Sequence, residues 1–136
     1  MPYDIFGFVE THPHAPGPWR AAFSIDDAVG RPDHVSATVF GLSKFAQPDA
    51  PFGNRGLPAA ISLDVQDWMA SAASLASEED VDGYDHGHTF ATLAELRNVD
   101  ASESVAWQTL IADLDELRRN AALSDTEIRV VLWANW

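Results

Sequence analysis

A short apolar run near each end of the chain places the strongest constraint on the fold. Residues 128–133 read Ile-Arg-Val-Val-Leu-Trp, a segment too short for a helix of normal length and rich in β-branched side chains. Residues 4–10, Asp-Ile-Phe-Gly-Phe-Val-Glu, have a similar character and are followed by a proline-rich stretch. We therefore predict two strands, with the C-terminal strand mostly buried and lying beside the N-terminal one.

A third strand is predicted immediately after the proline-rich stretch. Trp19, Ala21, Phe23 and Ile25 alternate with residues of smaller or more polar side chains. In a strand these four side chains would share one face, and the strand would pair back onto residues 4–10 as a hairpin.

Apolar residues at helical spacing predict two long helices. One begins after Ser62 as its N-cap and carries an apolar stripe that extends to Ala76. The longest helix is expected to open at Asp100, because Glu103 follows it at capping-box spacing. Its apolar face consists of Trp107, Leu110, Ile111, Leu114, Leu117 and Ala121.

Two shorter helices are predicted from their caps. Thr92 and Glu95 have capping-box spacing, which indicates a short helix near residues 92–98. Asp33 is a candidate N-cap for a short helix ending near Gly41, although the same residues could also form a strand. Residues 43–61 hold many prolines and glycines, and a loop of this length is often functional.

Length and composition indicate one globular domain over residues 1–136. The chain is 46% hydrophobic, including aromatic residues that disordered acidic chains lack. The predicted fold class is α+β: a small mixed or antiparallel sheet covered on one face by two or more amphipathic helices.

The charge balance limits the classes of function. There are 8 Lys plus Arg against 21 Asp plus Glu, which gives a formal net charge of −13. The few basic residues form no cluster, so direct nucleic-acid binding is not expected, whereas a basic protein surface would be attracted. The chain has no cysteine, no signal-peptide pattern and no long apolar run, so we expect a cytoplasmic protein without membrane association.

Several short segments follow one another in a characteristic order along the chain. They are Asp-Ile-Phe-Gly-Phe-Val-Glu at 4–10, Phe-Gly-Leu at 40–42, Arg-Gly-Leu-Pro at 55–58, His-Thr-Phe at 88–90, Thr-Leu-Ala-Glu-Leu at 92–96 and Arg-Val-Val-Leu-Trp at 129–133. This order of segments resembles a family of small uncharacterised proteins from actinobacteria and bacteriophages. In that family the first segment typically reads Asp-Ile-His-Gly and an acid follows the last strand. Phe6 and the Ala134–Trp136 ending depart from both features. The resemblance implies a phage-related or actinobacterial origin and transfers no activity.

Histidine pairs provide a candidate metal site. The pairs are His12 with His14 and His86 with His88. In an extended segment residues i and i+2 point to the same side, so two pairs could surround a divalent metal such as zinc. Asp82 or Asp85 would supply oxygen ligands. The alternative is that these histidines lie in exposed loops and bind no cofactor.

Four further residues are candidates for binding. Arg55, next to Asn54 and Gly56, could present its guanidinium to a carboxylate or phosphate, or form an internal ion pair. Asp4 could serve as a reactive carboxylate or could accept bonds from backbone amides. An exposed Trp136 would suit a subunit contact, as in a homodimer.

Two functional hypotheses follow. The first is a non-enzymatic acidic interaction protein, a phage-type or host accessory factor that binds a basic surface of a protein partner. The second is a small metal-assisted hydrolase that uses the paired histidines around a cleft bordered by Arg55.

Overall fold

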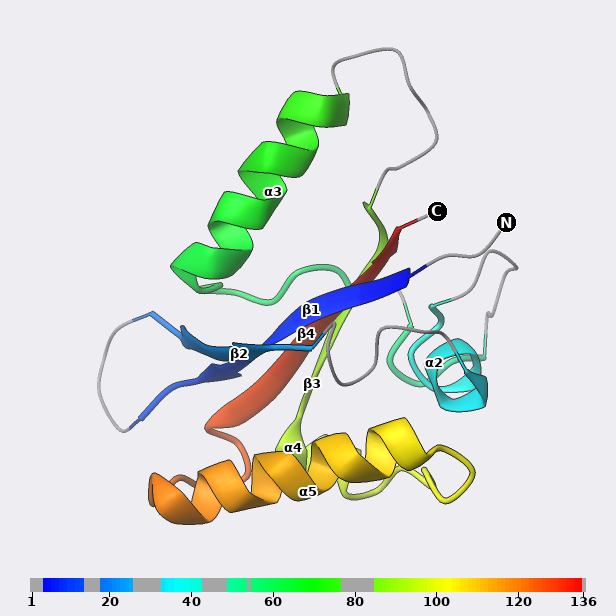
Figure 1. Ribbon diagram of the computed structural model, residues 1–136, viewed down its shortest axis with the longest axis vertical. Coiled ribbons are helices and arrows are strands. Elements are labelled where there is room, and N and C mark those ends of the chain that lie inside the picture. The colour runs from blue at the N-terminus through cyan, green and yellow to red at the C-terminus, as the bar shows by residue number, and fades with distance from the viewer. Residues whose placement is uncertain are drawn as a thin grey trace.

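The chain folds as an antiparallel four-stranded sheet with helices packed on it (Figure 1). The computed structural model describes residues 4–13, 18–25, 33–42, 49–53, 55–76 and 85–135. Its elements are β1 (Asp4–Thr11), β2 (Arg20–Ser24), α2 (His34–Thr38), α3 (Leu63–Ala76), β3 (Asp85–Thr92), α4 (Leu93–Leu96), α5 (Val105–Asn120) and β4 (Ile128–Asn135). The strand order is β2-β1-β4-β3, so the α+β prediction is confirmed.

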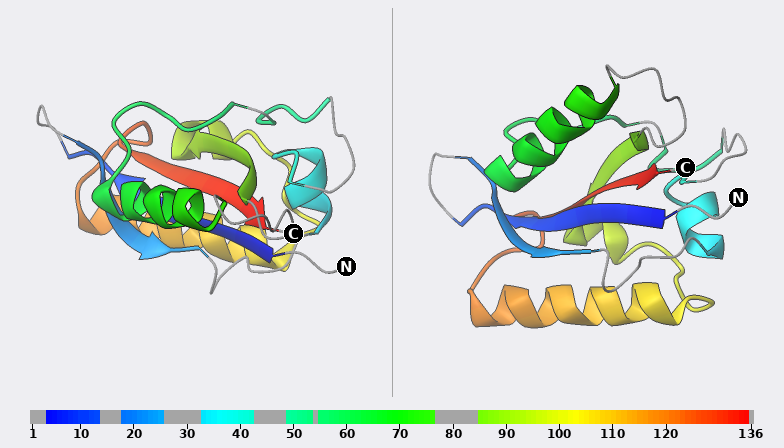
Figure 2. Two further views of the ribbon diagram at one scale, coloured as in Figure 1. Left: turned by 90° about the horizontal axis from the view of Figure 1, so that it is seen from above. Right: turned by 45° about the horizontal axis from the view of Figure 1, so that its top comes forward.

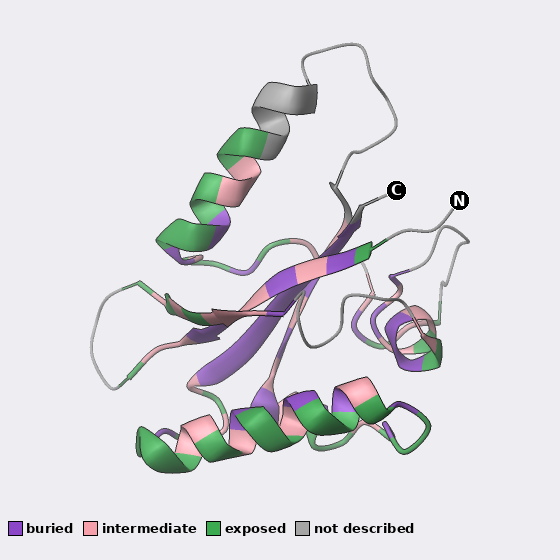
Figure 3. Ribbon diagram, viewed as in Figure 1, coloured by how far each residue is buried: buried purple, intermediate pink, exposed green. Residues whose placement is uncertain are grey.

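The two terminal strands form the centre of the sheet. β1 and β4 pair antiparallel along their whole length, from Asp4 opposite Asn135 to Thr11 opposite Ile128. Residues 128–134 of β4 are all buried (Figure 3). A Cβ atom on Gly7 would lie 2.1 Å from the carbonyl oxygen of Val131, so the close approach of these strands requires glycine. The predicted pairing of the two strands is thereby confirmed.

Helices pack on both faces of the sheet, which corrects the expectation that they cover only one. Alternate residues of β4 point to opposite faces, with Leu132 in a large core and Trp133 in a smaller one. The large core includes the buried face of α5, whereas α3 packs over the smaller core through Val65 and Trp68. The sheet therefore lies between α3 and α5 (Figure 2).

The hairpin of β1 and β2 is confirmed, but its predicted side-chain pattern is wrong. Val9 lies opposite Phe23 and Glu10 opposite Ala21, so Ala22 is an extra residue in β2. This irregularity exchanges the faces of the residues that precede it, because strand side chains alternate. Trp19 consequently does not share a face with Phe23 and Ile25; it lies over the guanidinium of Arg129.

Three of the four predicted caps are confirmed. Asp33 and Thr92 form complete capping boxes at α2 and α4, and the Ser62 hydroxyl accepts the Val65 N–H at the start of α3. At α5 the N-cap is Ser104, whose hydroxyl accepts the Trp107 N–H. The prediction of Asp100 as the opening residue is wrong because its carboxylate closes a local turn with Ser102 instead.

None of the helices in the described part of the chain is both long and apolar enough to cross a membrane.

Candidate functional site

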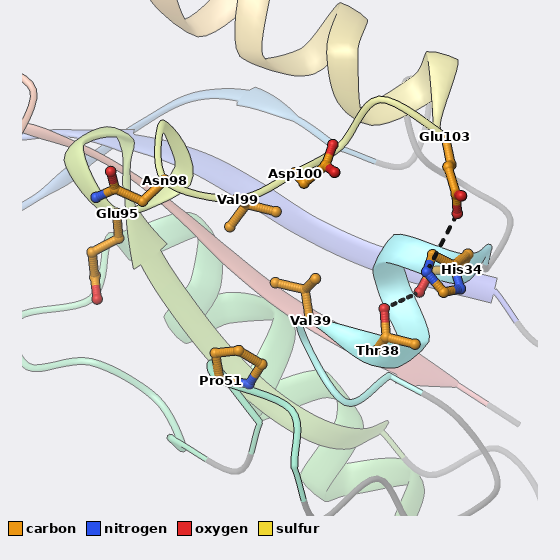
Figure 4. A pocket seen from close by; sticks show the side chains of 9 residues that line it. All are labelled: His34, Thr38, Val39, Pro51, Glu95, Asn98, Val99, Asp100 and Glu103. Carbon is orange, nitrogen blue, oxygen red and sulfur yellow. Dashed lines mark hydrogen bonds and ion pairs between the residues drawn. The ribbon is translucent and has the colours of Figure 1, made fainter.

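The candidate site is a cavity of about 390 Å³ between α2, the turn at residues 49–53, α4 and the loop that leads into α5 (Figure 4). We call it the acidic cavity. Its lining consists of His34, Thr38, Val39, Pro51, Glu95, Asn98, Val99, Asp100 and Glu103. Its lining therefore includes three carboxylates together with apolar side chains.

The three carboxylates of the acidic cavity have different partners. Glu95 forms a two-point ion pair with Arg55. Asp100 accepts the N–H and hydroxyl of Ser102 through Oδ1. Glu103 Oε2 lies 3.4 Å from His34 Nε2, and both side chains are exposed. Among the described residues, a permanent positive charge matches only Glu95, so the described lining holds surplus negative charge.

Hydrogen bonding keeps two of these groups ionised. The Arg55 guanidinium holds the pKa of Glu95 below its usual range against the opposing effect of burial. The Ser102 hydroxyl and amide lower the pKa of Asp100 in the same way. Both carboxylates are therefore negative at neutral pH.

Arg55 forms part of the wall behind Glu95. Its Nη1 and Nη2 donate to the two carboxylate oxygens at 3.0 and 2.6 Å, and Nη1 also donates to the Phe90 carbonyl at 3.1 Å. The guanidinium lies 4.5 Å from the centre of the Phe52 ring and 5.4 Å from that of Phe90. Of the two sequence interpretations for Arg55, the geometry is that of the internal ion pair.

Asp33 and Ser104 connect the two sides of the acidic cavity. Asp33 precedes α2 and Ser104 precedes α5, and the Ser104 hydroxyl donates to Asp33 Oδ2. Ser36 donates its amide and hydroxyl to Asp33 Oδ1, and Trp107 Nε1 donates to the Ser36 hydroxyl at 3.3 Å. Burial acts to raise the pKa of Asp33, and the bonds from Ser104 and Ser36 outweigh it and lower that pKa. This network fixes the spacing between the two elements that carry His34 and Glu103.

A second ion pair is buried on the α3 face of the sheet. Arg129 Nε donates to Glu10 Oε1 at 2.7 Å, and the Ser62 N–H donates to Glu10 Oε2 at 2.6 Å. The Trp19 ring covers the guanidinium, with 4.0 Å between the ring centre and the guanidinium carbon. Arg129 Nη2 also donates to the Ala59 carbonyl. The Glu10 side chain is fully buried, and burial lowers the pKa of Arg129 despite its partner. The geometry is that of a structural group closed to ligands.

The predicted histidine site is not assembled from the two histidines whose side chains are described. The His12 ring stacks on Trp19, and the backbone N–H of His12 donates to the Glu127 carbonyl. His88 lies 6.0 Å from Trp133 between ring centres, near the other end of β4. At about 3.3 Å per residue these ends lie roughly 20 Å apart, whereas zinc ligands lie about 2.0–2.1 Å from the ion. His12 and His88 therefore cannot bind one ion.

The remaining candidates add no metal or ligand contact in the described structure. His14, Asn54, Asp82 and Trp136 lie outside the described residues, as do the side chains of His86 and Asp85. Asp4 is exposed at the start of β1. Within the described ranges, no group of three or more histidine and acidic side chains is placed to hold a metal ion.

Sequence reasoning missed the acidic cavity as a site. In the sequence Glu95 and Asp100 have the spacing of helix-capping residues, and His34 is not paired with another histidine. The signal was the density of acids between residues 95 and 103, but only the packing of α2 against this loop makes a cavity.

Comparison with known proteins gave no match to a family model, to a curated protein or to a solved structure. The resemblance to the actinobacterial and phage family thus stays a prediction.

Proposed function

We propose that this protein is an acidic interaction protein and that its acidic cavity binds a lysine or arginine side chain from a basic protein partner. The observation that carries the proposal is a concave site whose surplus charge comes from two carboxylates, Asp100 and Glu103. A cation that enters this cavity would replace the water around both groups with charge-assisted hydrogen bonds.

The apolar part of the cavity suits the stem of such a side chain. Val39 and Val99 lie between the acidic groups, with Pro51 on the side of the turn (Figure 4). Lysine and arginine carry three or four methylene groups that pack on apolar surface while the charged end reaches a polar one. The cavity therefore offers a surface to each half of the side chain.

Charge also selects against anionic ligands. Among the described residues, Arg55 is the one arginine or lysine paired with a carboxylate of the lining, and Glu95 already neutralises it, with 2.6 Å between Nη2 and Oε2. The net charge of −13 on the whole chain would steer a basic partner toward the protein and would repel nucleic acid. The alternative of a metal-assisted hydrolase gains no support from the separation of His12 and His88.

The proposal is tested by titrating the protein with acetyl-Gly-Arg-Gly-amide and following backbone amide signals by NMR. We expect shifts confined to residues 34–39 and 95–103, and none with acetyl-Gly-Glu-Gly-amide. The double variant Asp100→Asn, Glu103→Gln should weaken arginine binding about tenfold or more, because hydrogen bonds to charged groups are each worth about 1.5–3 kcal/mol.

A matched control removes the same charge elsewhere. Asp113 and Glu116 are exposed on α5, outside the acidic cavity. The variant Asp113→Asn, Glu116→Gln should bind the arginine peptide as the wild type does. Equal weakening in both double variants would show that only overall charge matters, and an absence of arginine binding would overturn the proposal.

A further inference from the structure

A second cavity lies next to the acidic cavity. It has a volume of about 500 Å³ and is lined by Leu96, Arg97, Val99, Ala101, Ser102, Gln108 and Ile111. We call it the apolar cavity. Val99 belongs to the lining of both cavities, so the loop between α4 and α5 is the wall that they share.

The floor of the apolar cavity is hydrocarbon. Leu96 and Ala101 are buried, and Val99 and Ile111 are half-buried against the large core. Such a floor, with a few polar groups at its edge, is typical of a site for an apolar side chain.

The polar groups at the edge of the apolar cavity are already occupied. Arg97 donates to Asp115 at 2.6 Å and to Asp125 at 2.7 Å, so its charge is matched within the protein. The Gln108 side-chain amide donates to the carbonyls of Ala101 and Ser102 at 3.2 and 2.8 Å. These bonds hold the shared loop in place, and they leave hydrocarbon as the main surface for a ligand.

We propose that the two cavities form one docking surface for a protein segment that carries a basic residue and, a few residues away, a large apolar residue. The basic side chain occupies the acidic cavity and the apolar side chain occupies the apolar cavity, on either side of Val99. The inference rests on the proposed function, since the basic residue is the first anchor. Charge complementarity argues for a basic segment of another protein over a second copy of this chain, because two copies at −13 each repel.

Two anchors on one segment bind more tightly than either alone. Once the basic residue is bound, the apolar residue reaches its cavity at a high effective concentration, provided that the spacer fits the span. The two cavities together thereby select a partner by two residue types and by the spacing between them. The acidic cavity alone would select only a basic residue.

The test uses peptides of the form acetyl-Gly-Arg-(Gly)n-Leu-Gly-amide with about zero to four spacer glycines. We expect one spacer length to bind at least tenfold more tightly than acetyl-Gly-Arg-Gly-amide, and the gain to disappear when serine replaces leucine in the peptide. In the wild-type protein, methyl signals of Leu96 and Ile111 should shift with the leucine peptide and stay unchanged with the serine peptide. This measurement needs no variant that might lose its fold.

Ile111→Ser should abolish the gain from leucine and leave the binding of acetyl-Gly-Arg-Gly-amide unchanged. Ala112→Ser is the matched control, because Ala112 is the exposed neighbour on α5 and does not line the cavity. The control should keep the gain.

The outcomes separate this inference from the proposed function. If the arginine peptide binds but no spacer length improves it, the docking surface is overturned and the acidic cavity stands. If neither peptide binds, the proposed function fails and the inference fails with it. Dimerisation of the protein with its methyl signals shifted in the absence of peptide would also overturn the inference, in favour of a second copy as occupant.

Discussion

Two arginine side chains show how this chain uses its few cations. Arg55 pairs with Glu95 and lies against Phe52 and Phe90, while Arg129 pairs with Glu10 under Trp19. With 8 basic residues against 21 acidic ones, an internal carboxylate is readily found for a guanidinium, and the surplus acids are left for the surface. Aromatic rings then shield the pairs from water, which strengthens their attraction.

The buried pair on the α3 face predicts a large asymmetry between single and double variants. Arg129→Met should lower the free energy of unfolding by about 3–5 kcal/mol, because it leaves the fully buried Glu10 carboxylate without its partner. Adding Glu10→Gln should recover at least half of that loss, since no charge then remains buried and the oxygen of the new side-chain amide can still accept the Ser62 N–H. Urea unfolding followed by tryptophan fluorescence measures both. A double variant less stable than Arg129→Met would refute this interpretation.

At the scale of elements, one carboxylate organises the starts of two helices. Asp33 accepts the Ser36 N–H to cap α2 and also accepts the hydroxyl of Ser104, the N-cap of α5. The two helix starts carry opposite sides of the acidic cavity, so Asp33 contributes to the spacing of the cavity together with the bond from Trp107 to Ser36.

This shared cap predicts coupling between the two positions. Asp33→Ala should cost about 1–2 kcal/mol and Ser104→Ala about 1 kcal/mol, as for other N-caps. The double variant should lose less than the sum by at least about 0.5 kcal/mol, because the Asp33–Ser104 bond is counted in both single losses. Thermal and urea unfolding of the four proteins measure the cycle.

Ser62 supplies the control for this cycle. It caps α3 on the other face of the sheet and has no bond to Asp33. Asp33→Ala combined with Ser62→Ala should therefore be additive. Additivity in both cycles would mean that the Asp33–Ser104 bond contributes nothing.

The extra residue in β2 shows how one irregularity links distant elements. If Ala22 took a regular place in the ladder, alternation would place Trp19 on the face of Phe23. Because Ala22 is an extra residue opposite β1, Trp19 lies on the opposite face and covers Arg129, so β2 helps to enclose an ion pair between β1 and β4.

At the scale of the whole molecule, stability should fall in acid. Glu95 has a lowered pKa in the folded protein, chiefly because of Arg55. A carboxyl with a lowered folded pKa contributes stability that is fully present above its unfolded pKa, about 4.3, and is lost as the pH falls through the folded pKa. The Arg55–Glu95 pair joins the turn after Phe52 to β3 and α4, so its loss loosens one wall of the acidic cavity.

Glu95→Gln tests this pH dependence. The wild type should exceed the variant by about 1 kcal/mol at pH 7, and the difference should stay constant down to about pH 5 and shrink toward zero below about pH 4. Glu116→Gln is the control, because Glu116 is exposed and forms no ion pair within the described residues. Its difference from the wild type should remain near zero. A Glu95→Gln difference that grows in acid would contradict the sign derived from the Arg55 contact.

Local patterns in the sequence determined most of the elements. Apolar runs, helical stripes and cap spacing depend on residues a few positions apart, which is why β1, β4, α3 and the caps at Asp33 and Thr92 were predictable. The start of α5 was mispredicted because Asp100 and Ser104 are equally good caps by residue type. The turn that Asp100 closes with Ser102 and the contact of Ser104 with Asp33 together favour Ser104.

The sequence by itself thus determined the class of fold, the central strands and the surplus of negative charge. The tertiary structure alone decided which charges face each other. Glu10 pairs with Arg129, which is 119 positions away in the sequence, because of the register of the strands. Arg55 pairs with Glu95, which is 40 positions away, because of the packing of a turn. Pairings of this kind depend on how the whole chain closes, and no local spacing encodes them. The acidic cavity follows from the same closure, because its carboxylates are surplus only once the arginines have been assigned.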